Sequence, residues 1–136
     1  MDVKFTFEFG GINKFGKIYR PMAQVLLKSP SLQIWSQVWM VVDTGADFTI
    51  LPRYVAKDLG ISLEKDCVVD TTSGVGGEQK IYLCNLPVTA KVGNNERKIP
   101  LAFFDNDEVP PLLGRLGFLE TFNVEFLKSH VVIFRE

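Results

Sequence analysis

The chain of 136 residues has little of several features that would each indicate a particular class of protein. It has only two cysteines, which disfavours a secreted scaffold held by disulfides, so we expect a reducing, cytoplasmic location. Fifteen lysines and arginines against sixteen aspartates and glutamates give a net charge of -1, so no basic excess indicates a nucleic acid partner. The longest apolar run, Val38–Val42, is far shorter than the roughly 20 residues that cross a membrane, so we expect no membrane partner.

The overall composition, with 46% hydrophobic and 23% charged residues, is that of an ordinary globular protein. This length and composition predict one domain over residues 1–136, with enough apolar side chains for a core. The first residues, 1–6, alternate between apolar and polar side chains. They lack the basic and apolar stretches of a signal peptide, so we expect none there.

Hydrophobic and polar residues alternate along most of the chain, with the period of two that is typical of half-buried strands. Glycines and prolines divide this alternation into about nine short strands and one or two short helices. The expected strands cover residues 3–9, 18–27, 34–42, 67–72, 78–86, 87–92 and 98–104, followed by a closing hairpin over 124–134. The expected helices cover residues 52–59 and 117–122. This pattern predicts an all-β barrel or sandwich.

One segment combines groups that suit acid–base chemistry. An apolar strand ending at Val42 runs directly into Asp43-Thr44-Gly45-Ala46-Asp47, and apolar residues resume at Phe48. The apolar approach places Asp43 at the edge of the core, and Gly45 leaves room for backbone N–H groups beside the carboxylate. A carboxylate held in this way is prepared for catalysis. The alternative is an Asx turn, in which Asp43 only caps its own backbone.

The segment Asp43–Asp47 resembles the active-site motif of the retropepsin-like (retroviral-type) aspartic peptidases. Two further segments resemble that family in the same order. Gly74-Val75-Gly76-Gly77 is similar to its glycine-rich flap tip, and Leu112-Leu113-Gly114-Arg115 is similar to its second hydrophobic-hydrophobic-glycine motif. On local grounds alone, these two segments could be an ordinary hairpin turn and plain core followed by a turn.

The resemblance implies a retropepsin fold, which is a closed barrel with a β-hairpin flap, and aspartic endopeptidase activity without a metal or other cofactor. The implied catalytic residues are Asp43, Thr44 and Gly45. The implied substrate-binding residues are Ala46, Asp47, Phe48, Gly74, Val75, Gly76 and Gly77. Gly114 and Arg115 are implied as structural support, and we expect Arg115 to make a charge-assisted contact with Asp47.

Peptide hydrolysis of this kind uses two carboxylates about 3 Å apart that share one proton. The chain has one Asp-Thr-Gly segment, so the second carboxylate is expected from Asp43 of a second copy in a C2 homodimer. An extended peptide or protein is the expected substrate. Residues 130–134 are the expected dimer contact, with the core of a single chain as the alternative. Two other interpretations remain open: a retropepsin-fold module that binds peptides or dimerises without turnover, and an unrelated β-barrel with a fortuitous Asp-Thr-Gly.

The two cysteines fall in the strands on either side of the glycine-rich tip. Cys67 and Cys84 are equally distant from the centre of that tip, so a symmetric hairpin would place them opposite each other. They could form an oxidisable pair that restrains the hairpin, or they could be two reduced thiols packed as small hydrophobic side chains.

Overall fold

The computed structural model describes residues 2–74 and 76–136. In this part of the chain, strands form sheets of nine, three and two strands, accompanied by one α-helix and one 3-10 helix, which confirms the expected all-β class. The strands are β1 (Val3–Thr6), β2 (Glu8–Asn13), β3 (Gly16–Arg20), β4 (Met22–Lys28), β5 (Trp35–Val42), β6 (Thr49–Leu51), β7 (Cys67–Gly74), β8 (Gly77–Cys84), β9 (Val88–Val92), β10 (Asn95–Ile99), β11 (Leu101–Phe104), β12 (Leu112–Leu113), β13 (Asn123–Leu127) and β14 (Val131–Arg135). The helices are α1 (Arg53–Asp58) and η1 (Leu119–Thr121).

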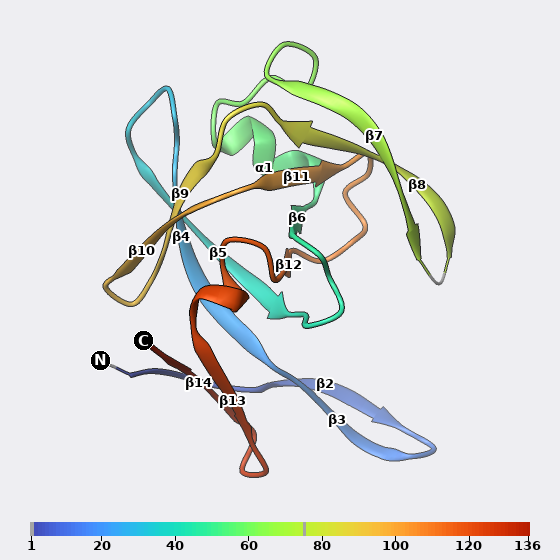
Figure 1. Cartoon of the computed structure of the whole chain (residues 1–136). Helices are drawn as coiled ribbons and strands as arrows, with labels where there is room; N and C mark the ends of the chain where they lie inside the picture. The colour runs from blue at the N-terminus through green and yellow to red at the C-terminus, as the bar shows by residue number, and fades with distance from the viewer. Residues whose placement is uncertain (1, 75) are drawn as a thin grey trace.

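The nine-stranded sheet has the order β10-β9-β4-β5-β12-β6-β11-β8-β7. Two of its pairings, β5 with β12 and β6 with β11, are parallel, and they join segments far apart in the sequence. Because β12 lies between β5 and β6, the loop after β5 lies beside the loop after β12. The β7–β8 hairpin forms the last two strands in this order, and it projects from the body of the molecule (Figure 1). Closure of this sheet into a barrel stays a prediction.

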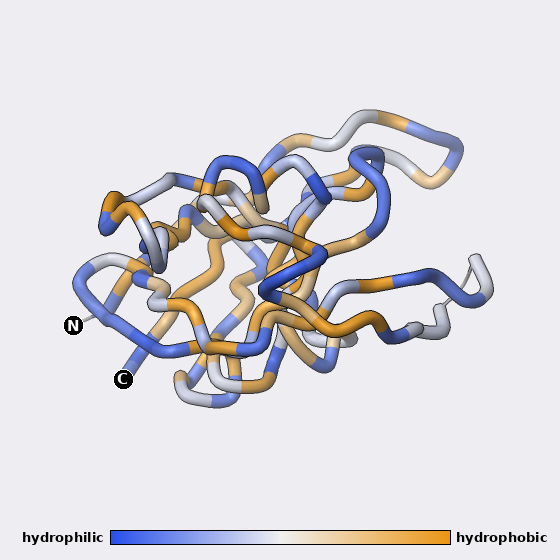
Figure 2. The backbone as a smooth tube through the Cα atoms, turned by 90° about the horizontal axis from the view of Figure 1, so that it is seen from above, coloured by the Kyte–Doolittle hydropathy of each residue, from blue (hydrophilic) through white to orange (hydrophobic). Residues whose placement is uncertain are grey.

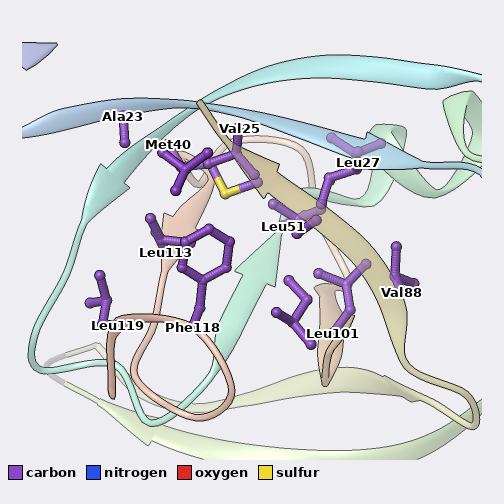
Figure 3. Close-up of a cluster of buried hydrophobic side chains, with 14 of the residues drawn as sticks. Ala23, Val25, Leu27, Met40, Leu51, Val88, Leu101, Leu113, Phe118 and Leu119 are labelled. Carbon is purple, nitrogen blue, oxygen red and sulfur yellow. The ribbon is translucent and has the colours of Figure 1, made fainter. Parts of the chain in front are cut away.

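The core is built from one face of several strands. Ala23, Val25 and Leu27 alternate along β4 with half-buried residues, and all three are fully buried. They face Met40 of β5 and side chains of β6, β9, β11 and the segment around η1 (Figure 3). Full burial of a valine or leucine side chain, such as Val25 or Leu27, stabilises the fold by about 1.5–3 kcal/mol. Leu113 belongs to the same cluster, so the core fixes β12 and the loop that follows it.

The expected helix over residues 52–59 is confirmed as α1. Pro52 precedes its first turn in an extended conformation, and Leu59 ends it. Gly60 follows with a φ of +66°, a left-handed conformation that glycine adopts without strain. The fully buried Ser29 supports this end, because its Oγ donates a hydrogen bond of 2.7 Å to the carbonyl of Leu59.

Three expected strands are divided in the structure, and the first of them, over residues 3–9, breaks at Phe7 between β1 and β2. The expected strand 98–104 breaks at Pro100, which lacks an N–H for a sheet, so that β10 pairs with β9 and β11 pairs with β6 and β8. Pro21 likewise separates β3 from β4. Conversely, the expected end of the first strand at Phe9 is wrong, because β2 continues through Gly10 and Gly11 with a register shift between Phe9 and Gly11, a β-bulge.

The three-stranded sheet has β14 at its centre, between β1 and β13. The expectation that residues 130–134 form a dimer contact is therefore wrong: both edges of β14 are paired within the chain, and Val132, Ile133 and Phe134 are buried in it. The alternative, the core of a single chain, describes this strand. The sheet brings the two ends of the chain close together (Figure 1).

Hydrophobic segments concentrate in the body of the molecule, and hydrophilic segments follow its outer loops (Figure 2). Within residues 2–74 and 76–136, no helix combines the length and the apolar character that crossing a membrane requires.

Candidate active site

Asp43 begins the loop that follows β5, at the point where β5 pairs with β12. Its N–H donates a hydrogen bond of 3.0 Å to the carbonyl of Leu113. One oxygen of its carboxylate, Oδ1, accepts a hydrogen bond of 2.9 Å from the N–H of Gly45, and its carbonyl accepts one of 3.2 Å from Ala46. The Asx-type bond considered from the sequence is thus present, and it orients a carboxylate that is half-buried at the core edge.

Gly114 lies against the backbone of this loop. A Cβ at Gly114 would stand 2.2 Å from the carbonyl carbon and oxygen of Phe48, so only glycine fits there. The N–H of Gly114 donates a hydrogen bond of 3.2 Å to Oγ1 of Thr49, which is fully buried. The second glycine motif therefore packs against the loop by close backbone approach.

Arg115 joins the loop at three points, and the residue after it adds a fourth. As expected, its Nη2 contacts Oδ1 of Asp47 at 2.8 Å, and its Nη1 also donates a hydrogen bond of 2.6 Å to the carbonyl of Thr44. Its backbone N–H donates to the carbonyl of Ala46 at 3.0 Å, and the next N–H, of Leu116, donates to the carbonyl of Asp47 at 2.8 Å. Because the Asp47 side chain is 73% exposed, the ion pair alone contributes at most about 1 kcal/mol. The main effect of Arg115 is therefore to hold the loop in one conformation.

The loop and the tip of the β7–β8 hairpin face one cleft of about 440 Å³. The expected site residues that line this cleft are Asp43, Gly45, Ala46, Asp47, Phe48, Gly74, Gly76 and Gly77. Val75 lies outside the described residues. Thr44 and the supporting residues Gly114 and Arg115 are not in the lining. The structure therefore brings residues of all three segments that carry the resemblance to one place: the first two line the cleft, and the third contributes Leu112 to the lining while Gly114 and Arg115 lie outside it.

Sequence reasoning missed six residues of this lining: Ile50, Thr72, Ser73, Gln79, Phe104 and Leu112. Two of them could have been found from the sequence, because residues two apart in a strand point to the same face of the sheet. Thr72 lies two residues before Gly74, and Gln79 lies two residues after Gly77. Thr72 and Gln79 are also opposite each other in the hairpin. Ile50, Phe104 and Leu112 were missed because their strands meet only through long-range pairings.

Gln79 differs from the other lining residues in carrying an unsatisfied polar group. Among the described residues its buried Oε1 has no hydrogen-bond partner, and its Nε2 would lie 3.9 Å from a Cβ at Gly76. The side chain therefore lies beneath the hairpin tip. A buried acceptor without a partner costs about 1–3 kcal/mol, which a bound donor would recover.

The chemistry that the cleft offers is that of one oriented carboxylate beside apolar walls and backbone groups of a hairpin. The second acid in the lining, Asp47, is engaged by Arg115, which leaves Asp43 for acid–base work. Within the residues that the structure covers, no group of three histidine, cysteine, aspartate or glutamate side chains is arranged to hold a metal ion.

Comparison with known proteins decides the family. A family model described as aspartyl protease matches residues 36–116, which is more than half of the chain and includes Asp43, the hairpin and Gly114. The chain belongs to the aspartyl protease family. A search of curated proteins finds no match to this chain.

Similar solved structures show which fold the chain has. A retropepsin-like aspartic protease from Rickettsia conorii is similar over 98% of both chains, with a TM-score of 0.63 and 21% identity. EIAV protease complexed with the inhibitor HBY-793 is similar over 71% of this chain and 82% of that one, with a TM-score of 0.52 and 25% identity. These similarities confirm the retropepsin-like fold expected from the sequence.

Proposed function

We propose that this chain is a homodimeric aspartic endopeptidase in which Asp43 of each of two copies supplies one catalytic carboxylate. The observation that carries the proposal is the cleft: one oriented carboxylate, the loop around it and the glycine-rich hairpin tip all face the same space of about 440 Å³. The proposed unit is the single domain of residues 1–136, and its cytoplasmic location stays a prediction.

The need for a second copy follows from the chemistry. Water-mediated peptide hydrolysis by carboxylates requires one acid and one base within a few ångströms of the same water. The chain supplies one Asp-Thr-Gly segment, and Asp47 is held by Arg115. A C2 axis beside the Asp43 loop would bring the two equivalent carboxylates together. The hydroxyl of Thr44, which is exposed in the single chain, would lie near that axis.

The reaction then follows from two carboxylates that share one proton. The ionised carboxylate takes a proton from a water held between the two, while the protonated one donates a hydrogen bond to the carbonyl oxygen of the substrate. The water oxygen bonds to the carbonyl carbon as the C=O π bond opens, and the protonated carboxylate transfers its proton to the former carbonyl oxygen, which gives a neutral gem-diol. Transfer of a proton to the peptide nitrogen then allows the C–N bond to break, and the carboxylates recover their shared proton. No covalent enzyme intermediate forms.

The walls of the cleft indicate the substrate. Phe48, Ile50 and Phe104 line it with apolar side chains, so a substrate with apolar residues near the scissile bond is favoured. The β7–β8 hairpin would act as a flap, with backbone groups at its tip available to an extended peptide. The unpartnered Oε1 of Gln79 is an acceptor for a peptide N–H.

The experiment that tests this proposal measures cleavage of a peptide library over a series of protein concentrations. Activity per chain is expected to rise with concentration and then level off as dimers form. Asp43→Asn is the matched control, because it keeps the side-chain shape and removes the ionisable group, and it should abolish cleavage.

A second measurement separates catalysis from binding alone. A statine-type inhibitor, which mimics the gem-diol, should bind the wild-type protein more tightly than the Asp43→Asn variant. Peptide binding without cleavage at any protein concentration would refute the enzyme and support a non-catalytic peptide-binding module. Activity per chain that does not change with concentration would refute the shared site.

A further inference from the structure

The two cysteines of the chain face each other at the base of the β7–β8 hairpin. Cys67, the first residue of β7, is the cross-strand partner of Cys84, the last residue of β8. Their Sγ atoms are 3.7 Å apart, and both side chains are half-buried. The opposition expected from the symmetry of the hairpin is therefore confirmed.

The hydrogen bonds around the pair show that it has the geometry a disulfide needs. The N–H of Asn85 donates a bond of 2.9 Å to the carbonyl of Asp66, so the next pair outward, 66 with 85, is a hydrogen-bonded one. Cys67 and Cys84 then form a non-hydrogen-bonded pair, in which the Cα atoms approach to about 4.5 Å. That separation lies within the range of disulfides, so rotation of the side chains can bring the sulfurs to the bond length of about 2.05 Å.

A cavity gives small molecules access to one member of the pair, Cys84. It has a volume of about 310 Å³, and Cys84 lines it together with Ile61, Leu86 and Asp66. None of its lining residues lines the cleft at Asp43. A reagent in this cavity can therefore reach Cys84 without entering the proposed active site, and the half-buried sulfur of Cys67 lies 3.7 Å from that of Cys84.

We propose that Cys67 and Cys84 are a redox modification site, at which a low-molecular-mass disulfide of the glutathione type converts the two thiols into one intramolecular disulfide. The Cys67 thiolate attacks a sulfur of the reagent, forming a mixed disulfide and releasing one reagent thiolate. The Cys84 thiolate then attacks the sulfur of Cys67, forming the Cys67–Cys84 bond and expelling the second reagent thiolate. The two cysteines lose two electrons and two protons in total, and the reagent disulfide is reduced to two thiols.

The order of the two attacks follows from the surroundings of the thiols. Burial raises the pKa of both thiols, and the neighbouring Asp66 carboxylate raises them further. The pKa of Cys84 is raised far more than that of Cys67, since Cys84 is the more buried. Cys67 therefore has the larger thiolate fraction and is the attacking group in the first step.

The disulfide would close a loop that contains the whole hairpin. Such a cross-link removes conformations from the unfolded chain and prevents the two strands from separating at their base. Formation of the bond does not depend on peptidase activity. Any effect of the disulfide on peptide cleavage rests on the proposed function, in which the hairpin acts as the flap.

The test uses the full chain and oxidised glutathione as the probe. Free thiols counted under denaturing conditions should fall from two to none, the mass of the monomer should fall by two hydrogens, and dithiothreitol should reverse both changes. With only two cysteines in the chain, that mass identifies the bond. Retention of both thiols, stable mixed disulfides on both cysteines, or cross-linked pairs of chains instead would overturn the proposal.

Two serine variants provide matched controls. Cys67→Ser and Cys84→Ser should each stop at a mixed disulfide, and Cys84→Ser, which retains Cys67, should form it faster. Oxidation of the wild type should raise the Tm by about 5 °C or more, a shift that Cys67→Ser should lack. An oxidised wild type with a lowered Tm would show that the bond strains the hairpin, and it would contradict the geometry. These results do not depend on cleavage, so failure of the proposed function would leave them interpretable.

Discussion

Replacing Gly114 by alanine tests the close approach on which the Asp43 loop depends. The added Cβ would lie 2.2 Å from two backbone atoms of Phe48, whereas distances under 3.0 Å essentially never occur. Backbone atoms cannot rotate away as a side chain can, so one of the two segments must move by about 1 Å. Overpacking of this kind costs about 3 kcal/mol, at the upper end of the usual range.

The magnitude can be read as a thermal shift. A chain of this length has an unfolding entropy of about 0.3 kcal/mol/K, so 3 kcal/mol lowers the Tm by about 10 °C. Thermal unfolding followed by circular dichroism measures this shift. Because the displaced loop carries Asp43, we also expect Gly114→Ala to lose peptide cleavage at temperatures where it is still folded.

Gly74→Ala is the matched control for the stability measurement. No atom lies within 4 Å of a Cβ built there, and the backbone does not require glycine. The Tm of Gly74→Ala should stay within about 3 °C of the wild type. A Gly114→Ala variant that unfolds within about 2 °C of the wild type would refute the reasoning, because the two backbones would then be farther apart than the structure has them.

Three further variants test other contacts. Ser29→Ala removes the buried hydroxyl that bonds Leu59 and should cost about 1–3 kcal/mol in the free energy of unfolding by urea, whereas Ser31→Ala, at an exposed position, should be nearly neutral. Arg115→Lys loses the planar guanidinium that bonds both Thr44 and Asp47, so kcat/KM should fall by about tenfold while the Tm decreases by only a few degrees. Unchanged kinetics would argue against a positioning role of Arg115. Gln79→Leu removes from the cleft the acceptor that has no partner among the described residues. It should raise KM by up to about tenfold and leave the stability unchanged or higher. A lower Tm with an unchanged KM would contradict a substrate contact of Gln79.

The sequence predicts well those elements whose pattern is local. The helix at residues 53–58 has a proline at its start and a glycine after its end, and the hairpin of β7 and β8 has alternating strands around a glycine-rich tip. The contact between Arg115 and Asp47 was available from the family resemblance, because both residues stand in its motifs. For the helix and the hairpin, the determining residues are few and adjacent in the sequence.

The elements that the sequence did not predict depend on distant pairing. Strands β6 and β12 have only three and two residues, too few for an alternation to be recognised. They exist because β5 and β11 lie beside them as parallel partners. For the same reason Ile50, Phe104 and Leu112 could not be assigned to the cleft. The burial of β14 depends on pairing with β1 at the opposite end of the chain.

The central claim is that two chains share one catalytic site, and subunit mixing measures this most directly. Wild-type chain and Asp43→Asn chain are mixed at a constant total concentration, allowed to exchange, and assayed for peptide cleavage. If only dimers with two Asp43 carboxylates are active, activity falls with the square of the wild-type fraction, to about one quarter in an equal mixture. Activity of about one half in that mixture would show that each chain carries a complete site, and it would contradict the account.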